Sequence, residues 1–327
     1  MLMFWLLRFA FVAIVSLLVW TGTAQADPTL PDAVKKADAK YLDLKDTETE
    51  DKSKKIEAGG GEEDTEPTAQ EISDGSLKAA LTYTESKAED SDETMRAPIV
   101  TVTFDGKEIG KFKGEAGFGD PSVSVQIANL DPGNPHPEVI VSFYTGGAHC
   151  CSDTNILTSS KDGADWQTVD LGQFDGGPLT ASDLDGDGVY EFETRDNAFL
   201  YTFGCYACSS APLEVLTVQD GAVKNITTDP RFHHEHELWL KDMITDVPDE
   251  DVNGFLAGYV GEKILLGEGK QAWELMLAHY DKDSDWGLET CGQPVNDKGE
   301  CPVKTELLSF PDALERMLNE NGYKVEK

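Results

Sequence analysis

The chain has few basic residues for its size. Its 327 residues include 27 lysines and arginines against 61 aspartates and glutamates, which gives a formal net charge of −34. Nucleic acid and anionic membranes carry charge of the same sign and would repel such a protein. We therefore expect no nucleic-acid partner, and we expect the acidic side chains to favour cations and basic partners.

Long apolar runs are also missing, apart from one at the start of the chain. Residues 1–26 contain Arg8, then an apolar run over residues 9–20, then the sequence Ala24-Gln25-Ala26. This order is typical of a secretory signal with an A-x-A cleavage site. We expect residues 1–26 to be a cleaved signal peptide, the mature chain to have no membrane span, and the protein to be periplasmic or secreted.

The common catalytic motifs are absent. The sequence has no G-x-S-x-G, no H-E-x-x-H, no P-loop and no dinucleotide-binding glycine pattern after a strand. Acidic residues are so numerous that choosing two of them as a glycosidase pair would be arbitrary. We do not expect an enzyme, and we assign no catalytic or cofactor-binding residues.

Composition divides the rest of the chain into three parts. Residues 27–72 are acidic, polar and poor in aromatics, so they bury too little apolar area to offset chain entropy, and we expect a disordered tether in which a short helix over residues 33–44 would be marginal on its own. Residues 73–231 contain short alternating runs such as 123–127, separated by Gly, Asp, Asn and Pro, as in a β domain. Residues 232–327 change to helical spacing, with helices expected over 249–257, 270–280 and 310–321. The last of these is expected to have Ser309 as its N-cap and Pro311 in its first turn.

The most informative local pattern is the stretch 183–191. It reads Asp-Leu-Asp-Gly-Asp-Gly-Val-Tyr-Glu, and its four carboxylates and central glycine are the features of a calcium loop, because oxygen ligands suit Ca²⁺ and glycine permits the sharp turn. An EF-hand would also need a glutamate where Thr194 stands, and flanking helices, but a strand pattern follows instead. The alternative is an Asp/Gly-rich turn that holds no ion. We predict a calcium site formed by Asp183, Asp185, Asp187 and Glu191.

A looser copy of this loop begins 54 residues earlier in the chain. Its candidate oxygen donors are Asn129, Asp131, Asn134 and Glu138, and it too runs into a predicted strand. The stretch that follows, 144–152, matches 201–209 at five of nine positions. A repeated order of loop, strand and cysteine turn indicates stacked β units. A third acidic stretch, 281–289, has a tryptophan in place of the turn glycine and is a weaker metal candidate.

The two loops resemble the calcium loops of FG-GAP and VCBS-type repeats, which form the blades of integrin-like β-propellers. This resemblance implies a D-x-D-x-D-G turn that joins two strands and holds Ca²⁺. A closed propeller needs at least about four blades, and residues 73–231 are too few for that number. We therefore expect a mainly β fold with a C-terminal α region, in which stacked β-repeat units form a partial propeller or a sandwich capped by the helices.

The six cysteines indicate disulfides, because an even count in an exported chain is typical of a disulfide framework. Cys291 and Cys301 are expected to close the loop between them. The other four lie in matching turns of the repeat and are expected to cross-link its two units, with the pairing left open: Cys150, Cys151, Cys205 and Cys208. A bond between the adjacent pair is the least expected of the pairings, because it forces a strained ring.

Two other roles for these cysteines are disfavoured. A redox role for the Cys205-x-x-Cys208 pair is disfavoured because no helix start follows it to lower a thiol pKa. A zinc site that uses His149 is disfavoured because an oxidising compartment favours disulfides.

Three of the six histidines fall within residues 233–237, at the join between the β and helical regions. Imidazole and carboxylate groups together suit a transition metal such as Zn²⁺ or Cu²⁺. We favour the alternative that these are solvated polar residues at a domain edge. The residues concerned are His233, His234, Glu235, His236 and Glu237.

These observations predict an exported calcium-binding β-repeat module with a binding or structural role in the cell envelope. Its partner would be an envelope protein or a glycan. The alternative is a metal-dependent hydrolase, or a periplasmic protein that handles transition metals, with its site in the 233–237 cluster.

Overall fold

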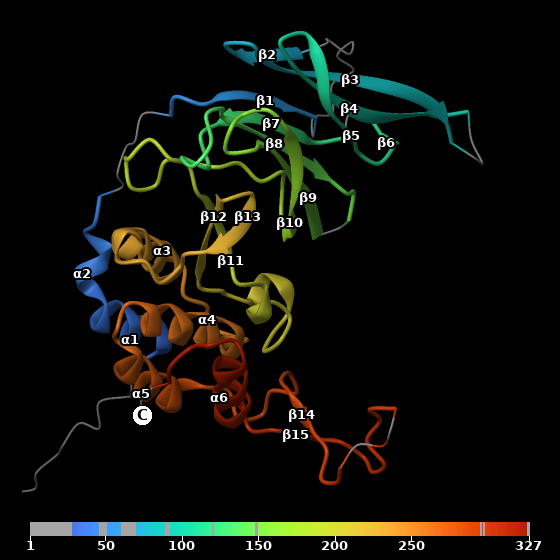
Figure 1. The fold of residues 1–327 in the computed structure, drawn as a ribbon. Helices are drawn as coiled ribbons and strands as arrows, with labels where there is room; N and C mark the ends of the chain where they lie inside the picture. The colour runs from blue at the N-terminus through green and yellow to red at the C-terminus, as the bar shows by residue number, and fades with distance from the viewer. Residues whose placement is uncertain are drawn as a thin grey trace, which may run out of the picture.

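The protein is described from a computed structural model, which covers residues 28–45, 51–59, 70–88, 92–119, 121–147, 150–294, 296 and 298–325. The signal peptide predicted over residues 1–26 lies outside this described part. Three larger antiparallel sheets and a group of helices follow one another along the molecule in the described residues (Figure 1). Among the described helices, none has both the length and the apolar character that crossing a bilayer requires.

The strands are assigned to the sheets as follows. The first sheet contains β2 (Gln70–Asp74), β3 (Leu77–Lys87), β4 (Thr94–Phe104) and β5 (Lys107–Lys113) in that order, with β6 (Gly117–Phe118) paired to β4. The second sheet has the order β1 (Lys54–Ala58), β7 (Val123–Ala128), β8 (Glu138–Tyr144), β9 (Cys150–Ser159) and β10 (Trp166–Asp175). The third sheet contains β11 (Phe192–Arg195), β12 (Leu213–Gln219) and β13 (Ala222–Asn225), and a separate ribbon pairs β14 (Glu289–Thr290) with β15 (Glu306–Leu307).

The helices lie at both ends of the described chain. Near the N-terminus are α1 (Leu30–Ala37) and α2 (Ala39–Leu42), and after the third sheet come α3 (His233–Thr245), α4 (Val252–Leu265), α5 (Gly269–His279) and α6 (Phe310–Glu320). Short 3-10 helices are η1 (Asn197–Phe199), η2 (Tyr206–Cys208) and η3 (Pro230–Phe232). Ser309 caps α6 by accepting a hydrogen bond from the backbone N–H of Asp312, as the predicted Ser-Phe-Pro start of this helix implies.

The first two sheets pack face to face around an apolar core. Alternate residues of β7 and β8, such as Val125 and Val141, are buried against Leu81 and Val100 of the first sheet. The other residues of β7 are buried too, because the segment before residue 183 covers the opposite face, where Gln126 bonds the backbone of Ala181. The alternation at 123–127 therefore marks a central strand that is covered on both faces.

The second and third sheets repeat one arrangement of strands. In each, an acidic loop leads into a strand (β8 or β11), a cysteine-containing segment follows, and the next two strands complete an antiparallel unit. Apolar side chains of both units, including Ile140, Leu171, Phe192 and Leu216, form one shared core. The internal repeat in the sequence thus corresponds to two β units that pack against each other.

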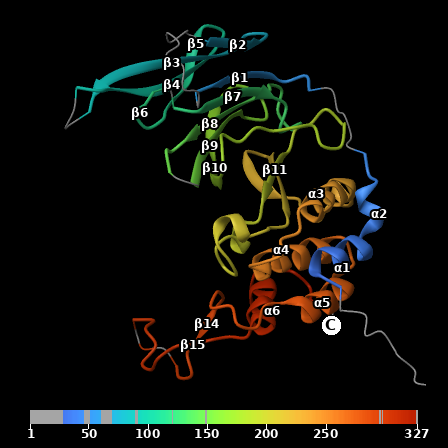
Figure 2. The same ribbon diagram turned by 180° about the vertical axis from the view of Figure 1, so that it is seen from behind.

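The helices form a core of their own beneath the third sheet (Figure 2). Helix α4 is buried from Val252 to Lys263 because the other helices and the segment before β12 surround it. Phe232 joins this helical part to the third sheet through contacts with Leu213 and Val215.

The prediction that residues 27–72 form a disordered tether is wrong for the described part of that range. Helices α1 and α2 bury Leu30, Val34 and Tyr41 in the helical core, and β1 is an edge strand of the second sheet. The physical reason is that a few apolar residues at helical spacing are enough to stabilise a short helix when they pack on the apolar surface of other helices. The average composition of residues 27–72 does not reveal the helical spacing of these few apolar residues.

The disulfides are only partly as predicted. Cys291 and Cys301 are bonded, which confirms that prediction. Cys205 is bonded to Cys208, so this pair does not cross-link the two β units, and that prediction is wrong. The two sulfurs lie in the same turn around η2, and the short chain between them lets them meet directly. Cys151 is also disulfide-bonded, while His149 and the side chain of Cys150 lie outside the described residues.

The predicted fold class is confirmed at the level of a mainly β protein with C-terminal helices. The described strands form no closed barrel, and the partial propeller stays a prediction. The β region ends close to the predicted boundary, since β13 ends at Asn225 and α3 begins at His233.

Candidate metal centre

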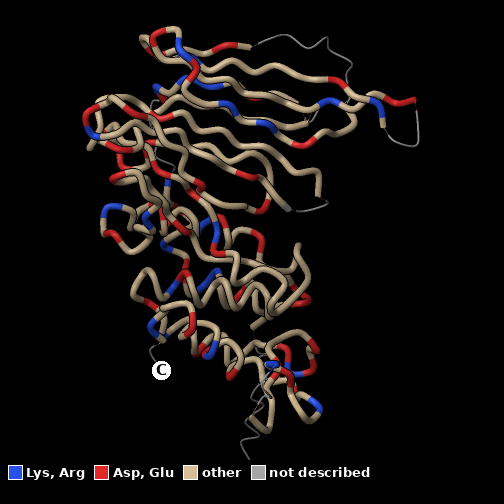
Figure 3. The backbone as a smooth tube through the Cα atoms, turned by 45° about the vertical axis from the view of Figure 1, so that its right-hand side comes forward, with Lys and Arg blue, Asp and Glu red and all other residues tan. Residues whose placement is uncertain are grey.

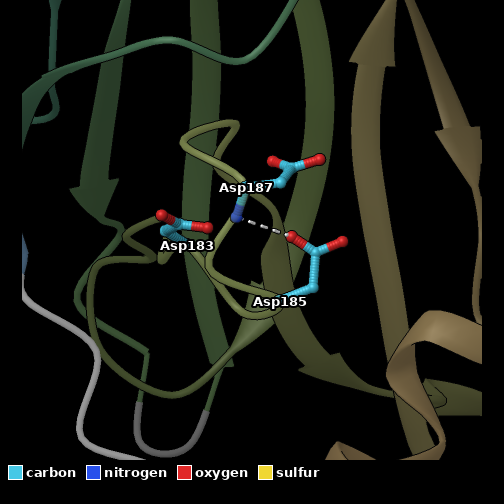
Figure 4. Close-up of side chains that lie close together, drawn as sticks. All are labelled: Asp183, Asp185 and Asp187. Carbon is cyan, nitrogen blue, oxygen red and sulfur yellow. Dashed lines mark hydrogen bonds between the residues drawn. The ribbon is translucent and has the colours of Figure 1, made fainter.

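The acidic loop 183–191 lies between the second and third sheets and leads into β11. Asp183, Asp185 and Asp187 each place a carboxylate oxygen within 4.8 Å of the other two (Figure 4). Within the described residues, this is the one group of three or more histidine, cysteine or acidic side chains close enough together to hold a metal ion. The structure therefore brings together three of the four residues predicted from the sequence to bind calcium.

Backbone hydrogen bonds hold these carboxylates in place. The backbone N–H of Gly188 donates to Oδ2 of Asp183 at 3.1 Å, and that of Asp187 donates to Oδ1 of Asp185 at 3.1 Å. Gly186 and Gly188 have φ angles of 77° and 87°, a left-handed conformation that glycine adopts without strain. The glycines thus fold the loop so that its carboxylates converge although their charges repel one another.

One oxygen of the cluster is buried and has no hydrogen-bond partner. It is Oδ1 of Asp183, whose other oxygen accepts the Gly188 bond described above. A buried carboxylate oxygen without a donor is costly, and such a group in a folded protein calls for an explanation such as a bound water or ion. The donor set around it contains only oxygen, which suits a hard cation such as Ca²⁺.

The ends of the loop are fixed to the β sheets. Ser182 and Glu191 exchange two backbone hydrogen bonds of 2.8 Å, which close the loop at its base. Gln126 of β7 bonds the backbone of Ala181 twice, at 2.8 Å each, and so ties the approach to the loop to the second sheet. Hydrogen bonds therefore attach the loop to β7 on one side, and its base leads directly into β11 on the other.

Glu191, the fourth predicted ligand, lies beneath the loop and is 2% exposed. Its Oε2 accepts a hydrogen bond from the backbone N–H of Leu184 at 3.2 Å. Burial is the main reason that the pKa of Glu191 is raised to about 8, and the negative charges of Asp185 and Asp187 raise it further. A cation in the loop would reverse this effect, because it would stabilise the ionised carboxylate.

Arg231, which sequence reasoning did not find, contacts the outside of the loop. Its Nη1 donates to Oδ2 of Asp185 at 2.7 Å and lies 3.5 Å from Oδ2 of Asp187, while the guanidinium also binds Asp229. Arg231 belongs to η3, more than 40 residues further along the chain, as the 46-residue separation from Asp185 shows. No local pattern links positions so far apart, so only the fold reveals this contact.

The looser loop 129–138 uses its oxygen atoms in hydrogen bonds. The buried carboxylate of Glu138 accepts bonds from the backbone N–H groups of Leu130 and Asp131 and from the side chains of Asn134 and Thr158, over distances of 2.7 to 3.1 Å. Burial raises the pKa of Glu138, and these donors offset part of that rise. The loop is thus closed by its own amide donors.

The other two predicted donors of that loop are placed differently. Asp131 accepts backbone hydrogen bonds from Gly133 and Gly221, and Asn129 donates to the carbonyl of Gly188 in the acidic loop at 3.4 Å. The carbonyl of Asn129 also accepts the backbone N–H of Tyr190 at 2.8 Å. The looser loop therefore supports the acidic loop mechanically, and its own metal assignment stays a prediction.

The histidine cluster does not converge on one point. His236 is buried, with Nδ1 2.7 Å from Oε1 of Glu262 and Nε2 2.8 Å from the carbonyl oxygen of Thr227, so both ring nitrogens are engaged. His233 and His234 lie on the exposed side of α3, where each is close to Glu237.

The carboxylates of the third acidic stretch, 281–289, are also not close enough together to form a metal-binding group among the described residues. The backbone of Asp281 is instead hydrogen-bonded to the side chain of Asn253. We therefore place the candidate centre at the acidic loop.

The chain is similar to known proteins along most of its length. Residues 235–322, which include α4 to α6, match the family model described as the sll0997 C-terminal domain. The "Probable thylakoid lumen protein sll0997" of Synechocystis sp. is 38% identical over 257 residues, covering 77% of this chain and 75% of that protein.

A second relative matches a smaller part of a longer protein. The "Uncharacterized protein y4bJ" of Sinorhizobium fredii is 36% identical over 236 residues, covering 70% of this chain but only 37% of the relative. No solved structure matches this chain. The length and identity of the first match show that the chain belongs to the sll0997 family.

Proposed function

We propose that the protein is an exported calcium-binding β-repeat module, in which one Ca²⁺ at the acidic loop stabilises the contact between the second and third sheets. Asp183, Asp185, Asp187 and Glu191 would hold the ion. The observation that carries the proposal is the buried Oδ1 of Asp183, which has no hydrogen-bond donor and lies within a cluster of three carboxylates. A divalent ion would supply the missing partner and offset the repulsion among the carboxylates.

The role of such an ion is structural. The loop joins β10 to β11, and Arg231 connects its outer side to the start of α3. An ion bound to the loop would therefore stabilise the junction where the second sheet and the third sheet meet. Extracellular calcium modules typically bind with dissociation constants of roughly 10⁻⁴–10⁻³ M.

The family and the charge support a location and a class of partner for this module. The relative in Synechocystis is named as a probable thylakoid lumen protein, which agrees with the signal peptide expected over residues 1–26. Acidic residues are distributed over the sheets and the helices alike (Figure 3), and this favours a basic protein or a glycan that binds with cations as the partner. The FG-GAP-type resemblance of the loop supports a module that binds rather than catalyses.

A calcium titration of thermal stability tests this proposal. At calcium concentrations of 10 to 100 times the dissociation constant, binding to the folded state alone raises the free energy of unfolding by roughly 1.4–2.7 kcal/mol. The melting temperature should therefore rise by a few degrees over a titration that reaches these concentrations. Asp185→Ala and Asp187→Ala should abolish this rise.

The matched control is Glu108→Gln, which removes one exposed carboxylate from β5, away from the loop. It should keep the full calcium response. Metal analysis of the purified protein completes the test, since calcium without zinc or copper agrees with the module. An intact protein whose melting temperature does not change at calcium concentrations well above about 10⁻³ M would rule the stabilising role out.

A further inference from the structure

The disulfide between Cys205 and Cys208 lies at the surface, around the short helix η2. Only two residues separate the cysteines, and both side chains are half-buried. A disulfide that closes so short a loop restricts the unfolded chain less than one that closes a long loop. Its contribution to stability is therefore small, and its position calls for another explanation.

The N-terminus of α4 lies directly beside Cys208. A Cβ atom on Gly254, in the first turn of α4, would come within 2.2 Å of the carbonyl oxygen of Cys208, so only glycine permits this approach. The N-cap residue Asp251 makes no side-chain capping hydrogen bond to the first turn, and its Oδ2 lies 4.0 Å from Sγ of Cys208. The sulfur thus lies beside the N-terminus of a 14-residue helix, whose dipole favours negative charge there, whereas the carboxylate of Asp251 opposes it.

A helix N-terminus favours the thiolate form of a nearby cysteine. The sequence disfavours a redox role because no helix starts after Cys208 within the same motif. In the fold, the helix comes from a segment that begins more than 40 residues later, as the 43-residue separation between Cys208 and Asp251 shows. The helix N-terminus that the local sequence lacks is therefore provided by α4 in the folded protein.

Two tyrosines form an aromatic surface next to the disulfide. Tyr201 is 50% exposed, and its ring centroid lies 5.6 Å from that of Tyr206, which directly follows Cys205. The backbone of Tyr201 has a φ of 58° and is fixed by a hydrogen bond from its N–H to Oγ of Ser209. Exposed aromatic side chains are common at contacts with other proteins.

We infer that Cys205–Cys208 is a redox-active disulfide that exchanges with the dithiol of a partner protein. A thiolate of the partner attacks Sγ of Cys205, the Cys205–Cys208 bond breaks, and Cys208 leaves as a thiolate beside α4. The second thiolate of the partner then attacks its own sulfur in the mixed disulfide and releases Cys205. The partner loses two electrons and becomes a disulfide, and the two protons that its thiols give up are taken up by Cys205 and Cys208.

The chain provides its own comparison in Cys291–Cys301. This disulfide closes a longer loop, with a sequence separation of 10, in the arm that carries β14 and β15. None of the described helices starts within residues 280–305, so neither cysteine is near a helix start in sequence.

The test equilibrates the full chain with mixtures of reduced and oxidised dithiothreitol, traps free thiols by alkylation, and measures each cysteine pair by peptide mass mapping. We expect half-reduction of Cys205–Cys208 at a ratio of reduced to oxidised reagent about tenfold lower than Cys291–Cys301 requires. Circular dichroism should show no unfolding at that ratio. Reduction of both pairs at the same ratio, or only together with unfolding, would overturn the inference.

A single variant tests the role of the helix. In Cys205→Ser, Cys208 is a free thiol, and its pKa should lie below the ordinary value of about 8.5. Ultraviolet absorbance of the thiolate across pH measures this value. A thiol pKa at or above the ordinary value would show that α4 does not activate Cys208, and the exchange measurement on the unaltered chain decides the question where this variant does not fold.

Discussion

Nη1 of Arg231 lies 2.7 Å from Oδ2 of Asp185, and this ion pair joins η3 to the acidic loop. The guanidinium supplies positive charge on the outer side of the carboxylate cluster, while the buried oxygen of Asp183 on the inner side has no donor. A cation in the loop and the guanidinium of Arg231 would therefore compete for the same negative charge.

Arg231→Gln should lower the free energy of unfolding in the absence of calcium, and it should increase the affinity of the loop for calcium. Exposed ion pairs contribute about 0.2–1 kcal/mol each, so we expect a loss of about 1 kcal/mol in calcium-free buffer. The calcium dissociation constant should fall a few-fold, because less positive charge opposes the ion. Melting curves in chelator and calorimetric titration measure the two effects. Arg316→Gln, which breaks an exposed pair with Glu320 in α6, should leave calcium binding unchanged.

The protonation of Glu191 predicts a pH dependence. Because its pKa is raised to about 8 in the folded protein, above its ordinary value in the unfolded chain, the folded state holds this proton more tightly. The resulting stability is complete below the ordinary carboxyl range and is lost as pH rises through about 8. In calcium-free buffer, Glu191 should lower the free energy of unfolding by up to about 1.4 kcal/mol per pH unit within this window.

Glu191→Gln removes this titrating group while it keeps a similar shape. The calcium-free variant should therefore lose less stability than the unaltered protein between about pH 5 and 8, as urea unfolding at several pH values would show. In the unaltered protein, calcium binding near neutral pH should release protons, which titration in buffers of different ionisation enthalpy detects. Identical pH profiles for the variant and the unaltered protein would contradict the assignment.

The sequence was most informative where local pattern alone decides the structure. The glycines at 186 and 188 and the alternating aspartates predicted a turn that gathers carboxylates, and the loop has that form. The Ser309 cap and the apolar spacing of the C-terminal segments likewise predicted helices that the structure contains. The glycines, aspartates and capping serine all lie within a few residues of the loop or helix that they predict.

The remaining features depend on contacts between distant segments. Arg231 reaches the acidic loop from η3, 46 residues further along the chain, and α4 reaches Cys208 because Gly254 leaves room for the Cys208 carbonyl. Helix α1 is stable only on the apolar surface of the helical core, so its own polar composition predicted disorder. Composition and periodicity contain no information about such pairings.

The buried pair of His236 and Glu262 predicts a large coupling. Burial alone would lower the pKa of His236, but the hydrogen bond and charge of Glu262 raise it overall, which favours the imidazolium. Removing one partner leaves the other buried without compensation and costs roughly 3–5 kcal/mol. His236→Leu should therefore be severely destabilising, and the double variant with Glu262→Met should be less destabilised than the sum of the single changes.

Chemical unfolding of the three variants gives this coupling as a double-mutant cycle. His233→Leu is the matched control, since His233 lies on the exposed side of the same helix, 3.9 Å from Glu237. Its effect should stay below about 1 kcal/mol. Additive losses in the buried pair would mean that the two side chains do not depend on each other.

The N-terminal helices provide the last prediction, through Asp38 and Lys263. Both side chains are almost fully buried; they form an ion pair, and Oδ2 of Asp38 accepts the hydroxyl of Tyr259 at 2.6 Å. Asp38→Ala would leave the buried ammonium of Lys263 with Glu268 alone, at a cost of roughly 3 kcal/mol or more, because an undercompensated buried charge is strongly destabilising. The control is Asp43→Ala, which removes an exposed carboxylate just after α2 and should change the free energy of unfolding by less than about 0.5 kcal/mol. If urea unfolding showed equal effects for the two variants, α1 and α2 would not contribute to the stability of the helical core, and the segment would act as the tether that its composition suggests.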